Sequence, residues 1–168
     1  MTHLFNCMPG ITHRKPGPIM AAAEAGADAE LISDGIHVHP AMIRLAFSLF
    51  GPEHMILISD SMEATGLSDG TYSLGGQAVT VSGNKATLAT DENTIAGSVT
   101  NLFDCMKYAV TVANIPAADA IVAATENPAK SAGVIDDYGR IAVGAYGSLL
   151  VIDEDMNLKQ VIHKGNCI

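Results

Sequence analysis

Residues 55–66, Met-Ile-Leu-Ile-Ser-Asp-Ser-Met-Glu-Ala-Thr-Gly, restrict the fold of this chain more than any other stretch. The apolar run 55–58 predicts a strand buried on both faces, as in a parallel sheet covered by helices. Asp60 follows where the run stops. Catalytic side chains gather at the carboxyl ends of such strands, because the strand holds them while the loops vary. Asp60 is therefore a candidate proton acceptor and donor, and a cap of the next helix or turn is the alternative.

The residues before this stretch predict a βαβ unit. Residues 19–27 predict a short Ala-rich helix ended by Gly26, and residues 29–33 predict a strand. Residues 40–50 carry apolar side chains at helical spacing before the strand at residue 55. Strand, helix and strand in this order indicate an α/β fold with parallel strands.

The chain changes character after residue 66. Residues 78–88 predict a β-hairpin around a Ser-Gly-Asn-Lys turn. Ser98 is a suitable N-cap for a helix over about residues 99–113, and residues 117–124 predict a second helix. The residues before such a helix could also hold an oxygen on free N–H groups, although every helix has an N-terminus.

The last forty residues predict a small β layer. Residues 127–130, Asn-Pro-Ala-Lys, are expected to break and restart the chain. Residues 139–141, 147–153 and 158–163 then predict three short strands. We expect these strands to pack with the hairpin at 78–88, which would join both regions in a second domain.

Composition excludes several classes of partner. The net charge of −9 argues against binding of nucleic acid or an anionic membrane, and no apolar run approaches the ~18 residues of a membrane span. Three widely spaced cysteines without a CxxC pair predict reduced thiols in a cytoplasm. An anionic ligand would need a local positive pocket, and residues 13–15, His-Arg-Lys, are the basic cluster of the loop 9–18.

Several histidines are candidate ligands. His37 and His39 alternate as strand neighbours do, so a metal pair is one hypothesis. Gly35 and Pro40 bracket them in a loop without a nearby third ligand, which favours a substrate contact by His37 instead. Composition alone would make His3 a frayed terminal residue.

Five motifs occur in order along nearly the whole chain: residues 3–8 (HLFNCM), 34–38 (DGIHV), 59–66 (SDSMEATG), 95–98 (IAGS) and 127–129 (NPA). Together they resemble the C-terminal part of the N-acetylglucosamine-6-phosphate deacetylase family, which are metal-dependent amidohydrolases. The resemblance implies a (β/α)₈ barrel, of which this chain would supply about strands 6–8, and part of a small β-sandwich. Residues 1–70 and 95–135 would then belong to the barrel, and residues 71–94 and 136–168 to the sandwich.

The resemblance also implies a reaction. It is hydrolysis of the acetamide of N-acetylglucosamine 6-phosphate, giving glucosamine 6-phosphate and acetate. His3 matches a ligand of a divalent metal, with zinc expected first and iron or another ion as alternatives. Such an ion lowers the pKa of bound water to about 7 and polarises the amide carbonyl. Asp60 matches the catalytic aspartate that takes the proton from the attacking water and passes it to the leaving amine.

Further residues match groups that bind the substrate. Asn6 and the backbone of Cys7 match groups that hold the sugar phosphate. Arg14 matches an arginine that reaches the phosphate across a homodimer interface, a role that suits its planar, charged fork. His37 matches a substrate-binding histidine. The loop that touches the sugar matches Ile95, Ala96, Gly97 and Ser98.

Two departures from the family pattern qualify these roles. Cys7 stands where the family usually has Ala, and we expect little effect because the contact there is through the backbone. The family's other metal ligands, a Glu and a His, would lie upstream of Met1, and closing a barrel takes about 200 residues or more. One ligand does not hold a catalytic ion, so we expect a shortened piece that is inactive alone.

Two alternatives remain open at this stage. One is an amidohydrolase that acts on another cyclic amide, for which the Asn6, Arg14 and His37 set is a poorer match than for a phosphosugar. The other is a non-catalytic fragment that associates with itself through strand edges and apolar faces left bare.

Overall fold

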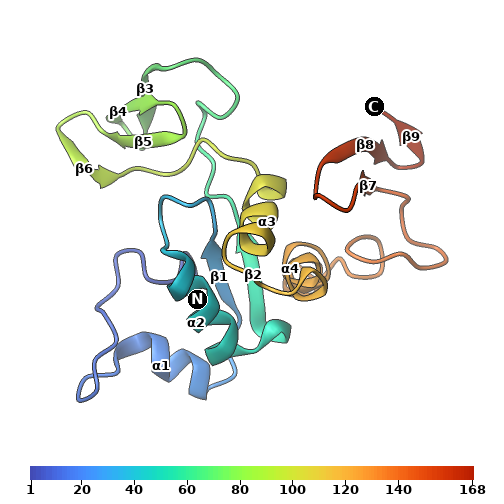
Figure 1. Ribbon diagram of the computed structural model, residues 1–168, viewed down its shortest axis with the longest axis horizontal. Helices are drawn as coiled ribbons and strands as arrows, with labels where there is room; N and C mark the ends of the chain where they lie inside the picture. Colours follow the sequence, from blue (N-terminus) through green and yellow to red (C-terminus); the bar gives the residue numbers. More distant parts are fainter.

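A computed structural model describes all 168 residues, and it is an α/β structure with three separate sheets (Figure 1). In chain order the elements are α1 (Gly17–Glu24), β1 (Ala29–Ile32), α2 (Pro40–Phe50), the 3-10 helix η1 (Pro52–His54), β2 (Met55–Ile58), β3 (Gly70–Leu74), β4 (Gln77–Ser82), β5 (Lys85–Leu88), β6 (Asp91–Ile95), α3 (Leu102–Thr111), α4 (Ala117–Ala124), α5 (Glu126–Ser131), β7 (Leu149–Ile152), β8 (Leu158–His163) and β9 (Asn166–Cys167). None of the helices is both long and apolar enough to cross a membrane.

The parallel pair β1 and β2 is the centre of the fold. Its register runs from Ala29 opposite Met55 to Ile32 opposite Ile58, so the two strands end at the same edge. Strands were predicted over residues 29–33 and 55–58, and both predictions are confirmed. Side chains from both faces are buried, because helices cover the strands as the continuous apolar pattern requires.

The first residues of the chain lie beside β1 on its other edge. The N–H of Leu4 donates to the carbonyl of Glu30 at 2.7 Å, and the N–H of Glu30 donates to the carbonyl of Met1 at 2.8 Å. His3 is therefore held next to β1 rather than frayed. Residues 1–4, β1 and β2 thus lie side by side, and the residues that follow them meet at the carboxyl ends of the strands.

Helix α2 forms where the sequence predicts it. Pro40 occupies the first turn, where no N–H is needed, and Gly51 ends the helix with a φ of 76°. Ile43 and Phe47 point from α2 into a core of 18 buried residues that also takes side chains from β1, β2, α3 and α4. Burial of one such side chain contributes about 1.5–3 kcal/mol, so this cluster accounts for most of the packing energy near the site.

Three helices differ from their sequence predictions. Helix α1 spans Gly17–Glu24 instead of residues 19–27, and its C-cap is Ala25, one residue before Gly26. Helix α3 begins at Leu102 instead of residue 99, because Asn101 caps it by accepting the N–H of Asp104 at 2.9 Å. Helix α5 forms at residues 126–131, where a break was predicted. Pro128 falls in its first turn, so no helical hydrogen bond is lost. The helix predicted over 117–124 is confirmed as α4.

The hairpin predicted at 78–88 is confirmed and extended to a four-stranded antiparallel sheet, β3 to β6. It has a small core of its own, in which Val79, Val81 and Ala86 pack with Met62 and Ala96. Met62 lies in the loop after Asp60, and Ala96 directly follows β6. The sheet is therefore attached to the segments that follow β2 and β6.

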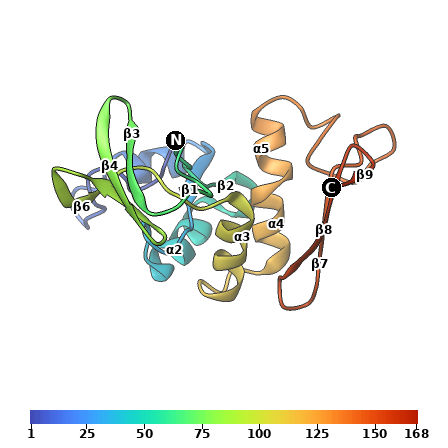
Figure 2. The same ribbon diagram turned by 90° about the horizontal axis from the view of Figure 1, so that it is seen from above.

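The terminal sheet, β7 to β9, lies at the opposite end of the molecule from β3–β6, with helices between them (Figures 1 and 2). The prediction that the two regions pack into one β layer is therefore wrong for this chain. The β3–β6 sheet packs on Met62 and Ala64 instead, and α3–α5 separate it from the tail. Residues 139–141, predicted as a strand, form none.

Candidate functional site

A cavity of about 490 Å³ opens where the strand pair meets the β3–β6 sheet. The residues singled out from the sequence that line it are His3, Asn6, Cys7, His37, Asp60, Ile95, Ala96 and Gly97. The rest of the lining is Ile32, Leu74, Gln77, Leu88, Asn93 and Thr94. Parallel strands end at one edge, so the expected proximity of His3 and Asp60 is met: both line one cavity. Their chemical roles stay predictions.

The turn at residues 3–7 has an unusual backbone. His3, Phe5 and Cys7 have φ values of 31°, 74° and 55°, whereas Leu4 and Asn6 between them do not have a positive φ. The side-chain amide of Asn6 braces the turn, because its Nδ2 donates to the carbonyls of His3 and Leu4 at 3.2 Å each. The N–H of Cys7 has no protein partner. Backbones that alternate in hand in this way direct N–H groups toward an anion.

His3 carries a polar atom that the protein leaves unpaired. Its Nδ1 is the one buried side-chain nitrogen or oxygen of the chain without a hydrogen-bond partner. Such an atom costs about 1–3 kcal/mol and calls for a ligand or an ion. However, no three His, Cys, Asp or Glu side chains lie close enough together to hold a metal ion. Catalytic zinc takes three ligands from protein, so the residues of this chain by themselves do not fit a metal centre.

Asp34 holds His37 in place, a role that was not predicted from the motif at residues 34–38. Its Oδ2 lies 2.8 Å from Nδ1 of His37, and its Oδ1 accepts the N–H groups of Ile36 and His37 at 2.9 Å. Burial would raise the pKa of Asp34, but the hydrogen bonds from His37 and Ile36 outweigh it and lower the pKa below the usual 3.8. His39 faces elsewhere, because its Nδ1 accepts the N–H of Ala41 at the start of α2. The metal pair of His37 and His39 is therefore not formed.

Asp60 is fixed through its backbone. Its φ is 52°, a left-handed value, and its carbonyl accepts the N–H of Ser98 at 2.8 Å. The carbonyl of Ser98 in turn accepts the N–H of Met62 at 2.9 Å, and the Ser98 hydroxyl donates to the carbonyl of Ser59. A Cβ on Gly97 would lie 3.3 Å from the Asp60 carbonyl, so the two loops touch closely. The loop 95–98 thus supports the position of Asp60.

Two predicted substrate contacts lie outside the cavity lining. Ser98 is 2% exposed, and its hydroxyl is used by the loop of Asp60. Arg14 sits at the tip of the exposed turn that Thr12 and Lys15 close by pairing. Its Nε donates to Nε2 of His13 at 3.1 Å, and it does not reach the cavity within this chain. A contact from a second subunit stays a prediction.

Known proteins resemble the whole chain. The family model described as amidohydrolase family matches residues 1–168. The N-acetylglucosamine-6-phosphate deacetylase of Bacillus subtilis is 41% identical over 167 residues, which is 99% of this chain. The chain spans 42% of that relative's length.

Two further comparisons concern a relative of similar length and a solved structure. A putative N-acetylgalactosamine-6-phosphate deacetylase of Escherichia coli K12 is 33% identical, and the match covers 97% of this chain and 96% of that protein. The structure of the Mycobacterium smegmatis N-acetyl-D-glucosamine-6-phosphate deacetylase, solved in complex with N-acetyl-D-glucosamine-6-phosphate, superposes with a TM-score of 0.89 at 38% identity. That superposition covers 99% of this chain and 44% of the M. smegmatis chain.

Proposed function

The chain belongs to the amidohydrolase family, and from this premise we propose that it forms one side of a deacetylase active site for N-acetylglucosamine 6-phosphate. The products of the reaction are glucosamine 6-phosphate and acetate. The observation that carries this proposal is the one cavity that gathers His3, Cys7, His37 and Asp60. The similarity to deacetylases of this substrate supports the substrate class.

Each side chain has a role that its chemistry suits. The carboxylate of Asp60 takes a proton from the attacking water and gives it to the amine nitrogen as the C–N bond breaks, because an amine leaves poorly without a proton. His37 and the loop 95–97 orient the sugar. The free N–H of Cys7 is a donor for the phosphate, whereas the Nδ2 of Asn6 is already bonded inside its turn. Asn6 therefore offers its Oδ1 to a hydroxyl.

The metal remains a proposal. The unpaired Nδ1 supports a ligand role for His3, but this chain offers no second and third donor near it. A divalent ion, zinc first and iron as the alternative, would need ligands from outside these 168 residues. We therefore also propose that the isolated chain does not turn over the sugar.

The architecture of the complete enzyme is part of the same proposal. We assign residues 1–70 and 95–135 to a (β/α)₈ barrel, as about its strands 6–8, because three neighbouring segments lead to a site at their carboxyl ends. Residues 136–168 are assigned to a β-sandwich. A homodimer, in which Arg14 reaches the phosphate of the other subunit, and a cytoplasmic location complete the proposal.

Calorimetric titration of the purified chain tests the substrate class. N-acetylglucosamine 6-phosphate is the probe, hydantoin is the cyclic-amide comparison, and His37→Ala is the variant. We expect the chain to bind the phosphosugar and not hydantoin. His37→Ala should weaken the affinity for the phosphosugar about tenfold or more. Asp136→Asn changes a carboxylate that is 95% exposed outside the cavity, and it should bind like the original chain. Binding of hydantoin in preference to the phosphosugar would overturn the substrate assignment.

Self-association is the second candidate, and the terminal sheet favours it. Leu150, Val151 and Leu158 are 49%, 43% and 44% exposed, and β7 is an edge strand that pairs with β8 on one side only. The accessible surface of 9474 Å² exceeds the value for a compact 17.4 kDa protein by about 1,600 Å². That excess is about twice the ~800 Å² that each partner contributes to a standard interface. Apolar lining residues also surround a cavity of about 980 Å³ between this sheet and α3–α5.

Light scattering over a range of concentrations tests this second candidate. A lysine on an edge strand blocks strand pairing, so Val151→Lys should reduce the mass to that of one chain. Leu67→Lys changes an apolar side chain that is 60% exposed elsewhere, and it should leave the mass unchanged. A single-chain mass for the unaltered protein at every concentration would exclude self-association.

A further inference from the structure

The carboxylate of Asp34 makes one contact that its turn does not need. The bonds from its Oδ1 to the N–H groups of Ile36 and His37 close the turn, as an Asp after a strand commonly does. The Oδ2 instead meets the imidazole Nδ1 of His37 at 2.8 Å. The side chains of Asp34 and His37 are only 3% and 5% exposed, so water does not compete for this bond.

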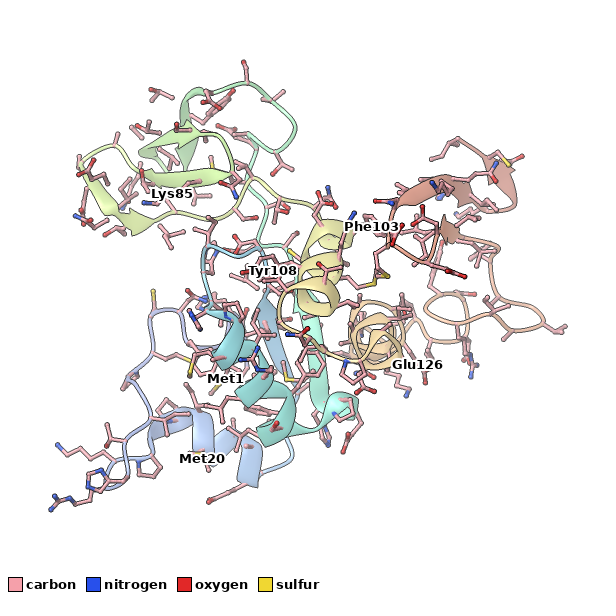
Figure 3. The ribbon with its side chains drawn as sticks, viewed as in Figure 1. Met1, Met20, Lys85, Phe103, Tyr108 and Glu126 are labelled. Carbon is pink, nitrogen blue, oxygen red and sulfur yellow. The ribbon has the colours of Figure 1, made fainter.

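The turn is anchored on α3 from both sides. Gly35 has a φ of 82°, and a Cβ there would lie 2.7 Å from the ring of Tyr108, which therefore packs directly on the turn. Tyr108 lies near the centre of the molecule, on the helix beside β1 and β2 (Figure 3). On the other side, the hydroxyl of the fully buried Ser33 donates to the carbonyl of Cys105 at 2.9 Å. These contacts leave Asp34 little freedom to turn away.

We infer that Asp34 is a positioning residue that fixes His37 in the tautomer with its hydrogen on Nδ1, so that Nε2 offers a lone pair to the cavity. An ionised carboxylate only accepts hydrogen bonds, so the hydrogen between the two side chains belongs to Nδ1. Nε2 has no protein partner and is not closed off from the cavity that His37 lines. The other titratable residues that line this cavity are His3, Cys7 and Asp60.

The tautomer decides which ligand groups the site accepts. A lone pair on Nε2 takes a group that donates, such as a sugar hydroxyl or an amide N–H, and rejects a carbonyl or ether oxygen at that position. This inference rests on the proposed function for the identity of the sugar, but the tautomer itself is a property of the chain alone. The two are therefore tested separately.

Asp34→Asn is a sharp test because it keeps the shape and reverses the polarity. The amide oxygen still accepts the N–H groups of Ile36 and His37 and so preserves the turn. The amide nitrogen donates to Nδ1 of His37, which forces the ring hydrogen onto Nε2. Asp28→Asn is the matched control, since Asp28 meets the Nδ1 of His54 at 3.0 Å on the exposed surface.

Histidine-labelled ¹H–¹⁵N NMR at about pH 8, where imidazole is neutral, reads the tautomer directly. We expect His37 to carry its hydrogen on Nδ1 in the original chain and in Asp28→Asn, and on Nε2 in Asp34→Asn. The affinity for N-acetylglucosamine 6-phosphate should fall about tenfold or more in Asp34→Asn, because a donor then faces a donor.

Each outcome is decisive. A hydrogen on Nε2 or an averaged tautomer in the original chain overturns the inference, even if Asp34→Asn fails to fold. An unchanged tautomer in a folded Asp34→Asn also overturns it. The expected tautomers without any binding of the sugar by the original chain support the role of Asp34 and contradict the proposed substrate.

Discussion

Replacement of Asn127 by Ala should show how the second residue of α5 secures the central strand pair. The side chain of Asn127 is buried, and its Nδ2 donates to the carbonyls of Pro52 and Met55 at 2.8 Å each. These bonds join α5 to the turn from which β2 begins. Because β2 ends next to Asp60, the same bonds hold the base of the strand that carries the candidate catalytic carboxylate.

The magnitude follows from the two bonds. Each buried carbonyl that loses its donor costs roughly 1–1.5 kcal/mol, and Ala regains about 0.5 kcal/mol as a better helix former than Asn. We therefore expect Asn127→Ala to lower the free energy of unfolding by about 2 kcal/mol. With a urea m value of about 2 kcal/mol/M, the midpoint falls by about 1 M.

Urea unfolding followed by circular dichroism measures this shift. Asn84→Ala is the control, because Asn84 lies in the exposed turn between β4 and β5, and its midpoint should move by less than about 0.25 M. Asn127→Asp should cost more than Asn127→Ala, since a carboxylate would face two carbonyl oxygens without a hydrogen to donate. Equal midpoints for Asn127→Ala and Asn84→Ala would refute the reasoning.

Three further predictions follow from single contacts. Because the pKa of Asp34 is lowered in the folded chain, its stabilisation is present above the ordinary value of 3.8 and is lost as the pH falls; Asp34→Asn should flatten the acid side of the urea midpoint against pH. Burial raises the pKa of the Cys105 thiol to about 12, so a thiol reagent at neutral pH should label the exposed Cys7 and Cys167 but reach Cys105 only in denaturant, as counted by mass spectrometry. Ser98→Ala should cost about 1 kcal/mol in urea unfolding and speed hydrogen exchange in the loop of Asp60, and unchanged exchange would contradict its supporting role.

Local patterns in the sequence were sufficient for the elements that carry the site. The apolar run at β2 and the helical spacing of α2 are each decided within about ten residues, and tertiary packing agrees with both. The meeting of His3 and Asp60 also follows from topology, because parallel neighbours end at one edge. These predictions depended on the spacing of apolar residues and on the order of the strands, not on contacts between distant side chains.

The predictions that failed depended on competition between partners. Ser98 and Asn101 are both suitable N-caps, and Ser98 lost that position because its hydroxyl bonds the carbonyl of Ser59 across the fold. A sequence pattern contains no information about that carbonyl. The placement of the β3–β6 sheet is similar, since its alternating strands indicate a sheet but not the face on which Met62 and Ala64 receive it. The Asp-Gly-x-His spacing was the one available indication of the pair of Asp34 and His37.

The backbone around the cavity indicates that this side of the site is formed by the chain itself. Seven non-glycine residues have a positive φ, and His3, Cys7 and Asp60 among them line the cavity. Each such conformation costs on the order of 1–3 kcal/mol and persists only where neighbouring contacts enforce it. The hydrogen bonds of Asn6 enforce it in the first turn, and those of Ser98 enforce it at Asp60. All of these contacts lie within the 168 residues, so the geometry that would bind the phosphosugar does not depend on a metal. On the proposed function, binding and turnover should therefore separate in this chain: we expect the sugar to bind to a preformed surface without being hydrolysed, because the chain does not supply three metal donors close together.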